Sequence, residues 1–385
     1  MSIKKSYKRS TCRLCGSKDL SLAFPINSTP IADNYFKERV DKLKQDYFSL
    51  DLYLCNNCSH IQLIEVIDPS ILFSNYVYKS SVSLGLVKHF ECYVSEVIEK
   101  FKPKVDSLII DIGSNDGSFL KFFKNRGFKV LGIDPAKNIA KEATKEGIKT
   151  IPNFFDQKLS KLLKKEYGKA EIITANNVFA HSDNLDQILK GINNLLEKNG
   201  IFIFEVSYMV DIVERFLFDT VYHEHLCYHT IIPLDKFFEK NKMELFDIKK
   251  IGTKGGSIRC FVQHKGGDKQ ISNIVSSLIE KEKNERYNLI SRYKNFSIKV
   301  NEKKNQTLKF IKSLKQKGSN IAGYGASATV TTLLHHFEIG DFLECLFDDN
   351  PDKHHTFSPG YNLRVLPSDQ IYQKSPDYII ILAWN

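Results

Sequence analysis

Four cysteines are the first residues in the chain whose type and spacing suit a chemical role. They form two C-x-x-C pairs, Cys12 with Cys15 and Cys55 with Cys58. Four thiolates in tetrahedral geometry suit Zn²⁺, and such a closed site leaves no position for a substrate. The other four of the eight cysteines are scattered singly, and a disulfide framework would be unusual in a cytoplasmic protein of this size. The spacing predicts a structural zinc site. Reduced cysteines without metal, or an iron–sulfur cluster, are the alternatives.

A second chemical feature is an apolar segment that runs into a glycine turn, Leu108-Ile-Ile-Asp-Ile-Gly113-Ser-Asn-Asp-Gly117. Glycines allow the backbone to approach a ligand closely, and the helix that follows offers free amides. Dinucleotide folds usually show three glycines, whereas Asn115 occupies the middle position here and no third glycine follows in register. The turn therefore favours S-adenosylmethionine (SAM). A dinucleotide or a purely structural turn is the alternative.

Polar residues after the neighbouring strands extend this cofactor site. Asp134 ends the second predicted strand, 21 residues after Gly113, where a carboxylate would accept hydrogen bonds from ribose hydroxyls. Asp156 follows the third strand and could meet the adenine amine, or it is an ordinary loop residue. The predicted cofactor-binding residues are Asp111, Gly113, Ser114, Asn115, Gly117, Asp134, Pro135, Asp156, Asn176 and Asn177.

A polar cluster, Val221-Tyr-His-Glu-His225, follows the fifth predicted strand and should share a rim of the sheet with His181. His223 and His225 point oppositely if the chain is extended, which disfavours a shared metal. General acid–base chemistry fits better, with structural histidines as the alternative. A carbon next to a carbonyl must lose a weakly acidic proton, and its enolate oxygen needs donors. The cluster therefore suits methyl transfer to carbon.

Alternating apolar and helical segments predict the elements that position these residues, and together they indicate an α/β fold with a mostly parallel, doubly wound sheet. In such a sheet, ligands bind at the carboxyl ends of the strands. The predicted strands are Ser107–Ile112, Lys129–Ile133, Ile148–Ile151, Ile172–Ala175, Ile201–Val206 and Gly256–Gln263, and the helices are Ser118–Arg126, Lys137–Glu146 and Leu185–Lys198.

The last third of the chain predicts two further parts. Apolar residues at helical spacing between Lys269 and Lys317 indicate amphipathic connecting helices. A second Rossmann-like unit then contains the glycine turn Gly323–Ala328 and strands at Asn320–Tyr324, Glu344–Asp348 and Tyr378–Ala383. A unit ending at that strand would lack its last helix, so we expect the chain to continue past Asn385. The predicted domains are 1–75, 76–268 and 269–385.

Composition limits the class of protein. The 385 residues are 42% hydrophobic and 12% aromatic, which is typical of globular domains with large cores. The net charge of +10 comes from lysines spread along the chain, with no block of five or six like charges, so a nucleic-acid partner is disfavoured. No apolar run approaches the roughly 18 residues of a membrane span. The first ten residues lack a signal peptide's apolar stretch, so we expect a cytoplasmic protein.

Six motifs in order resemble those of the nucleotide-sugar C-methyltransferases that act on 4-keto-deoxyhexoses, the C-3 branching enzymes. They are the two C-x-x-C pairs, DIGSNDGSFL, NNVFAH around His181, YHEH at Tyr222 to His225, GGSIR at Gly255 to Arg259, and GYGASA. The resemblance implies an N-terminal zinc domain, a Rossmann-like SAM methyltransferase domain and a C-terminal Rossmann-like domain that helps to hold the sugar nucleotide. Lys254 stands where that family commonly has histidine.

The resemblance also implies roles for single residues. His225 would be the base, with Tyr222, Glu224 and His181 beside it, and Tyr76 would close the pocket. We therefore expect C-methylation of a nucleoside-diphosphate 4-keto-deoxysugar at C-3, by a monomer or weak homo-oligomer with no nucleic-acid or membrane partner. The motifs do not distinguish dTDP, GDP and CDP sugars. An RNA-modifying methyltransferase, or a non-enzymatic zinc- and nucleotide-binding protein, is the alternative.

Overall fold

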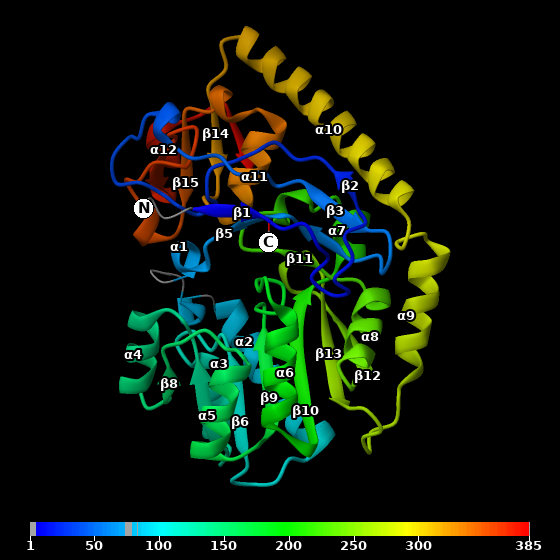
Figure 1. The fold of residues 1–385 in the computed structure, drawn as a ribbon. Coiled ribbons are helices and arrows are strands. Elements are labelled where there is room, and N and C mark those ends of the chain that lie inside the picture. Colours follow the sequence, from blue (N-terminus) through cyan, green and yellow to red (C-terminus); the bar gives the residue numbers. More distant parts are fainter. Residues whose placement is uncertain (1–4, 74–78, 83, 385) are drawn as a thin grey trace.

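The computed structural model describes residues 5–73, 79–82 and 84–384. Tyr76, predicted to close the pocket, lies outside the described residues. Figure 1 shows a central α/β unit in cyan and green, a smaller C-terminal α/β unit in orange and red, and blue N-terminal strands next to both. No helix of the described part is long and apolar enough to cross a membrane.

The N-terminal strands form two small antiparallel sheets. One pairs β1 with β5, and the other has the order β11-β4-β3-β2. Their bounds are Ser6–Lys8 (β1), Leu20–Phe24 (β2), Leu52–Cys55 (β3), Ile61–Leu63 (β4), Glu65–Ile67 (β5) and Cys227–Tyr228 (β11). Strand β11 comes from the central part of the chain, directly after the polar cluster. The N-terminal sheet therefore includes a strand from the central part of the chain. The domain boundaries predicted at residues 75 and 268 stay a prediction.

The central unit is built on a seven-stranded sheet of order β12-β13-β10-β9-β6-β7-β8. Strand β13 pairs antiparallel with both of its neighbours, and the other pairs are parallel. This confirms the predicted fold class. The strands are Leu108–Ile112 (β6), Lys129–Ile133 (β7), Thr150–Ile151 (β8), Ala170–Asn176 (β9), Leu196–Ser207 (β10), Met243–Ile251 (β12) and Ser257–His264 (β13). All but β12 were predicted.

Helices cover the central sheet and lead to its carboxyl edge. They are Pro69–Phe73 (α1), Leu84–Phe101 (α2), Ser118–Lys124 (α3), Lys137–Lys145 (α4), Gln157–Tyr167 (α5), Leu185–Leu195 (α6), Met209–Glu214 (α7) and Ile231–Lys240 (α8). The helices α3, α4 and α6 were predicted, within one to three residues at their ends. Helices α2, α5 and α8 were missed, since their apolar residues are interleaved with many charged ones or with phenylalanines that also suit strands.

The predicted connecting helices are α9, Asn273–Asn284, and α10, Ile290–Gln316. Figure 1 shows them running along one side of the molecule toward the C-terminal unit. That unit has a parallel sheet of order β16-β15-β14-β17. Its elements are Ile321–Tyr324 (β14), Ala328–Phe337 (α11), Cys345–Asp348 (β15), Arg364–Pro367 (β16), Ile371–Lys374 (α12) and Tyr378–Ile381 (β17). Strand β16 was not predicted.

Short 3-10 helices complete the described chain. They lie at Lys42–Lys44, Ser80–Val82, Phe218–Thr220, Thr253–Gly255, Gly340–Phe342, Pro351–Lys353 and Ser368–Gln370.

A buried carboxylate fastens α9 to the central unit. Glu282 is fully buried and accepts hydrogen bonds from the hydroxyl of Tyr208 (2.7 Å) and from the amides of Ile231 (2.6 Å) and Ile232 (2.9 Å). Those amides are the first of α8, whose N–H groups have no partner within the helix. A carboxylate at a helix N-terminus is also favoured by the helix dipole.

We expect Glu282→Ala to lower the free energy of unfolding by about 2–4 kcal/mol, because it leaves three buried donors without an acceptor. Thermal or urea unfolding followed by circular dichroism measures the change. The matched control is Glu280→Ala, which removes an exposed carboxylate from the same helix and should change stability by less than about 0.5 kcal/mol. Equal unfolding midpoints for the two variants would contradict the assigned role.

Candidate functional site

A cavity of about 280 Å³ lies at the carboxyl ends of the central strands. Twelve predicted site residues line it, although they come from segments up to 114 residues apart. They are Asp111, Gly113, Ser114, Asn115, Asp134, Pro135, Asn176, Asn177, His181, Tyr222, Glu224 and His225. Gly117 and Asp156 are not among the lining residues.

The glycine turn after β6 forms one wall of the cavity. Gly113 has φ 74°, and a Cβ atom there would lie 2.2 Å from a methyl carbon of Val178, so only glycine fits. The amide of Asn115 donates to Asp134 Oδ2 and the amide of Ala136 donates to Asp134 Oδ1, each at 2.9 Å. These bonds hold the Asp134 carboxylate at the cavity wall, and each oxygen can still accept from a ligand hydroxyl.

This wall is acidic. Burial raises the pKa of Asp111 to about 7, the Asp134 charge adds to the shift, and a 2.6 Å hydrogen bond from the Thr174 hydroxyl opposes it. Burial also raises the pKa of Asp134, against the two backbone amides that it accepts. Two carboxyl groups so close to one cavity favour a cationic ligand. SAM, which carries a sulfonium and an ammonium group, fits such a wall.

Asn176, at the end of β9, supports a polar ligand. Its side-chain nitrogen and oxygen are both buried, and neither has a hydrogen-bond partner in the part of the chain that the structure describes. Buried polar atoms without partners are costly, and they are expected where a ligand completes the hydrogen bonds. The residue therefore fits a cofactor with amide-like donors and acceptors at this end of the cavity.

Two predicted cofactor residues have positions outside the cavity lining. Asp156 is exposed and its Oδ1 accepts from the amide of Leu159 at 2.7 Å, which caps the N-terminus of α5. Gly117 precedes α3 with φ 78° and packs against Ile148, where a Cβ would approach to 2.9 Å. Gly117 therefore shapes the turn.

Another part of the cavity wall carries His225, whose protonation the geometry defines. Its Nδ1 lies 3.0 Å from the carbonyl of Thr220, an acceptor only, so Nδ1 bears the hydrogen. Its Nε2 then accepts from the Tyr222 hydroxyl at 3.0 Å. Burial, with a contribution from Lys254, lowers the pKa of His225 to about 4. The imidazole is therefore neutral near pH 7 and its Nε2 can take a proton.

His181 lies beside this pair. Its ring centroid is 5.0 Å from that of His225, and its other face stacks on Phe73 at 5.7 Å. Its buried Nε2 has no hydrogen-bond partner among the described residues. Burial, with further contributions from the neighbouring His225 and Lys254, lowers the pKa of His181 well below its usual value. The loop after β9 therefore presents a second neutral imidazole to the cavity.

Glu224 and Lys254 complete this wall. Burial raises the pKa of Glu224 to about 7, Asp33 adds to the shift, and Lys254 opposes it. Sequence reasoning did not predict Lys254, Phe73 or Asp183 as site residues, yet all three line the cavity. The signal for Lys254 was its place directly before the Gly255-Gly256 pair. His223 does not line the cavity, and its Nε2 lies 3.3 Å from the carbonyl of Phe48.

The two histidine loops are joined by Arg13, which lies between the first pair of cysteines. Its side chain is fully buried and donates to Asp183 Oδ1 at 2.9 Å, two residues after His181. It also donates to the carbonyl of Leu63 and, at 3.4 Å, to that of Leu226, directly after His225. The cysteine-rich unit thus contacts both loops that bring histidines to the cavity. We call this part of the lining, with His181, Glu224, His225 and Lys254, the histidine wall.

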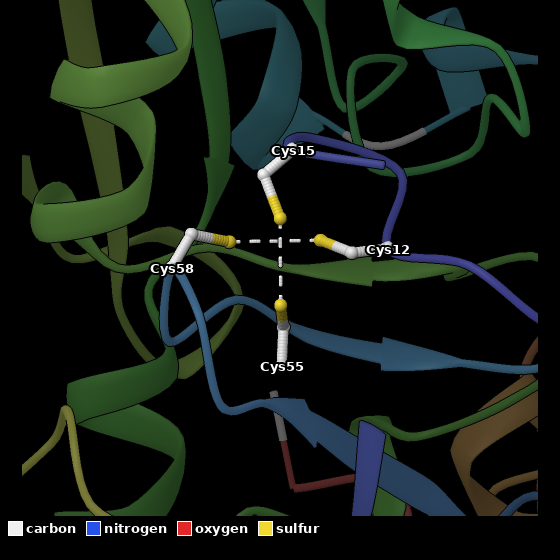
Figure 2. A group of neighbouring side chains, drawn as sticks. All are labelled: Cys12, Cys15, Cys55 and Cys58. Carbon is white, nitrogen blue, oxygen red and sulfur yellow. Dashed lines mark hydrogen bonds between the residues drawn. The ribbon is translucent and has the colours of Figure 1, made fainter. Parts of the chain in front are cut away.

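The four predicted metal ligands converge on one point (Figure 2). Their sulfur atoms all lie within 4.8 Å of one another, with 3.6 Å between Cys12 and Cys58 and 3.5 Å between Cys15 and Cys55. A tetrahedron with zinc–sulfur bonds of about 2.3 Å has edges of about 3.8 Å, so a zinc ion fits. The Cys58 contact lowers the pKa of Cys12 to about 5, whereas burial raises that of Cys55 to about 11. Four thiolates at these distances would repel one another, and a cation between them would remove that repulsion.

Comparison with known families divides the chain into three matched parts. Residues 12–73 match a model described as "Putative zinc binding domain". Residues 86–246 match a "Methyltransferase domain", and residues 252–385 match a "C-methyltransferase C-terminal domain". These three matches together support a C-methyltransferase. The zinc module and the SAM cofactor predicted from the sequence agree with these matches and with the four close cysteines.

One curated relative aligns with almost the whole chain. It is C-methyltransferase NovU from Streptomyces niveus, 28% identical over 375 residues, which cover 97% of this chain and 89% of the relative.

Solved structures resemble about half of the chain. Magnesium protoporphyrin IX methyltransferase (ChlM) from Synechocystis PCC 6803, with bound SAH, is 14% identical with a TM-score of 0.38, over 47% of this chain and 84% of that one. An S-adenosylmethionine-dependent methyltransferase from Clostridium acetobutylicum ATCC 824 is 18% identical with a TM-score of 0.37, over 47% and 92%.

We expect about one zinc per chain by atomic emission spectrometry, and substantially less in Cys55→Ser. Because a closed site contributes folding free energy, Cys55→Ser should also lower the unfolding temperature. Exposed Cys92→Ser is the matched control and should keep both values. Protein purified without chelator that contains no zinc would contradict the assignment.

We expect Asp134→Ala to weaken SAM binding by roughly tenfold or more, since buried ribose hydroxyls would lose a charged acceptor, a loss of about 1–3 kcal/mol. Isothermal titration calorimetry measures the dissociation constant. In the companion variant Asp156→Ala, whose side chain caps α5, we expect less than about a twofold change. Unchanged affinity in Asp134→Ala would place the ribose elsewhere.

Proposed function

We propose that this C-methyltransferase methylates C-3 of a nucleoside-diphosphate 4-keto-deoxysugar after base-catalysed enolate formation. The observation that carries the proposal is the neutral His225, with its hydrogen on Nδ1 and a basic Nε2, in the lining of the same cavity as the acidic turn. An oxygen or nitrogen acceptor would not need two neutral histidines, a tyrosine and a carboxyl group around it. A carbon acid does need them. Bound SAM would supply the methyl group as an electrophile.

In this proposal His225 is the base. The C-3 hydrogen leaves as a proton to Nε2, and the electrons of the C–H bond form the enolate. The Tyr222 hydroxyl occupies Nε2 in the structure, so it must turn away before the proton is taken, and it then donates to the substrate. His181 and Glu224 lie beside the pair to bind or polarise the sugar. Tyr76 keeps its proposed role in closing the pocket, outside the described residues.

A second glycine turn supports a nucleotide-linked substrate. In the first turn, Gly113 donates to the carbonyl of Ile133 at 2.7 Å, and Asp134 accepts two backbone amides. In the C-terminal unit, Gly325 donates to the carbonyl of Phe347 at 2.7 Å. Asp348 there accepts the amides of Ala326 (2.6 Å) and Asn350 (2.8 Å). The same pattern at a second strand end suits a second nucleotide, and we propose that it holds the nucleoside part of the substrate.

We expect His225→Asn to lower turnover by about 10²–10⁴-fold while SAM affinity stays unchanged, because the side chain is the base and does not touch the acidic wall. Turnover is measured by mass spectrometry with SAM and a panel of dTDP-, GDP- and CDP-linked 4-keto sugars. His355→Asn is the control, an exposed histidine of the C-terminal unit with φ 64°, a conformation that asparagine tolerates. If His225→Asn turns over at the wild-type rate, His225 is not the base.

A further inference from the structure

One cation in the cavity has no role in the function proposed so far. Among the described residues, Lys254 is the only lysine or arginine that lines the cavity. It forms no hydrogen bond or ion pair with the part of the chain that the structure describes, whereas Lys249 and Lys250, just before it, pair with Glu96 and Asp211. A cation that lines a cavity without a partner is placed to meet a negative charge on a ligand.

The backbone holds Lys254 in an unfavourable conformation. Its φ of 52° and ψ of 36° are left-handed, which costs a residue other than glycine roughly 1 kcal/mol. The next residue, Gly255, is fixed by packing, since a Cβ there would lie 2.5 Å from Leu217 and 2.6 Å from the Trp384 ring. Strain of this kind persists where the surroundings impose it, and it concentrates at functional sites.

The charge of Lys254 acts on the other residues of the histidine wall. It contributes to the lowered pKa of both His181 and His225, and it opposes the rise in the pKa of Glu224. The ammonium group is therefore close enough to influence all three. In the empty cavity it weakens the base, but an anion formed on the substrate would be stabilised by the same charge.

The enolate oxygen needs such a charge. The Tyr222 hydroxyl is hydrogen-bonded to His225, and His181 is neutral, so neither offers a positive charge. A ketone that loses a proton to a base as weak as His225 depends on strong stabilisation of its oxygen.

We propose that Lys254 is a catalytic residue that donates a hydrogen bond to the C-4 carbonyl oxygen of the substrate and stabilises the enolate. This inference rests on the proposed function. The C-3–hydrogen bond breaks and its proton passes to His225. Its electron pair becomes the second bond between C-3 and C-4, and the carbonyl electrons move to oxygen. Lys254 keeps its protons throughout.

Enolisation can be measured without methyl transfer. In D₂O with S-adenosylhomocysteine bound, exchange of the C-3 hydrogen of the 4-keto sugar is followed by NMR or mass spectrometry. We expect Lys254→Met to slow exchange by about 10²–10³-fold, the effect of removing one oxyanion donor. Lys254→Arg, which keeps the charge, should stay within roughly tenfold of wild type. Calorimetry should show an S-adenosylhomocysteine affinity within about twofold of wild type in both.

The matched control is Lys242→Met. Lys242 is an exposed lysine with φ 58°, so the same side-chain change is made in the same backbone conformation outside the cavity. Its exchange rate should equal that of wild type. Comparison of the unfolding temperatures of the two Met variants shows whether Lys254→Met is folded. If it is not, the Lys254→Arg and Lys254→Gln exchange rates decide: retention in Arg with loss in Gln supports the role.

The outcomes separate the two proposals. If the wild type neither exchanges nor methylates any of the dTDP-, GDP- or CDP-linked 4-keto sugars, the proposed function fails and this inference fails with it. If the wild type exchanges and Lys254→Met exchanges equally fast, only the role of Lys254 is overturned. A higher KM with unchanged kcat in Lys254→Met would also overturn the role of Lys254, because this residue would then bind the substrate without stabilising the transition state.

Discussion

The arrangement of His181 and His225 depends on the contacts of one buried group, the guanidinium of Arg13. A charge with no exposed surface costs several kcal/mol unless it is paired and hydrogen-bonded, and here Nε and one of the two terminal nitrogens have partners. Its partners are the Asp183 carboxylate, in the His181 loop, and backbone carbonyls that include that of Leu226, next to His225. The cysteine pairs fix the turn that carries Arg13. The zinc unit therefore acts as the support that brings two distant loops together.

The loop that carries His225 is held from other directions as well. The Phe48 carbonyl of the N-terminal part accepts from His223, and Thr332 of α11 donates to the carbonyl of Val221 at 2.7 Å. The indole of Trp384 donates to the buried carboxylate of Asp219 at 2.6 Å. The loop thus lies where three parts of the chain meet, so the orientation of His225 depends on how all three pack. A Rossmann-like unit alone would leave it without these partners.

The cavity is electrostatically divided. One part of its wall carries Asp111 and Asp134, and another part carries neutral histidines and Lys254. A sulfonium cation suits the first wall, and a developing oxyanion suits the second. Burial produces both effects, because it raises the pKa of the carboxyl groups and lowers that of the imidazoles. On a solvent-exposed surface these pKa shifts would be smaller, so the carboxyl groups and the imidazoles would differ less from their usual charge states.

The sequence by itself determined what depends on local geometry. Two C-x-x-C pairs, the turn from Gly113 to Gly117 and the period of the strands predicted the cysteine cluster, a turn at the cavity and the fold, since each pattern is set by residues close together in the sequence. Tertiary structure decided the rest. It placed β11 in the N-terminal sheet and joined Arg13 to Asp183, 170 residues away. It made Asp156 a helix cap, a role that the sequence alone does not distinguish from ligand binding. It also placed Lys254 in the lining of the cavity. Pairings across such distances leave no periodic pattern, so only packing reveals them.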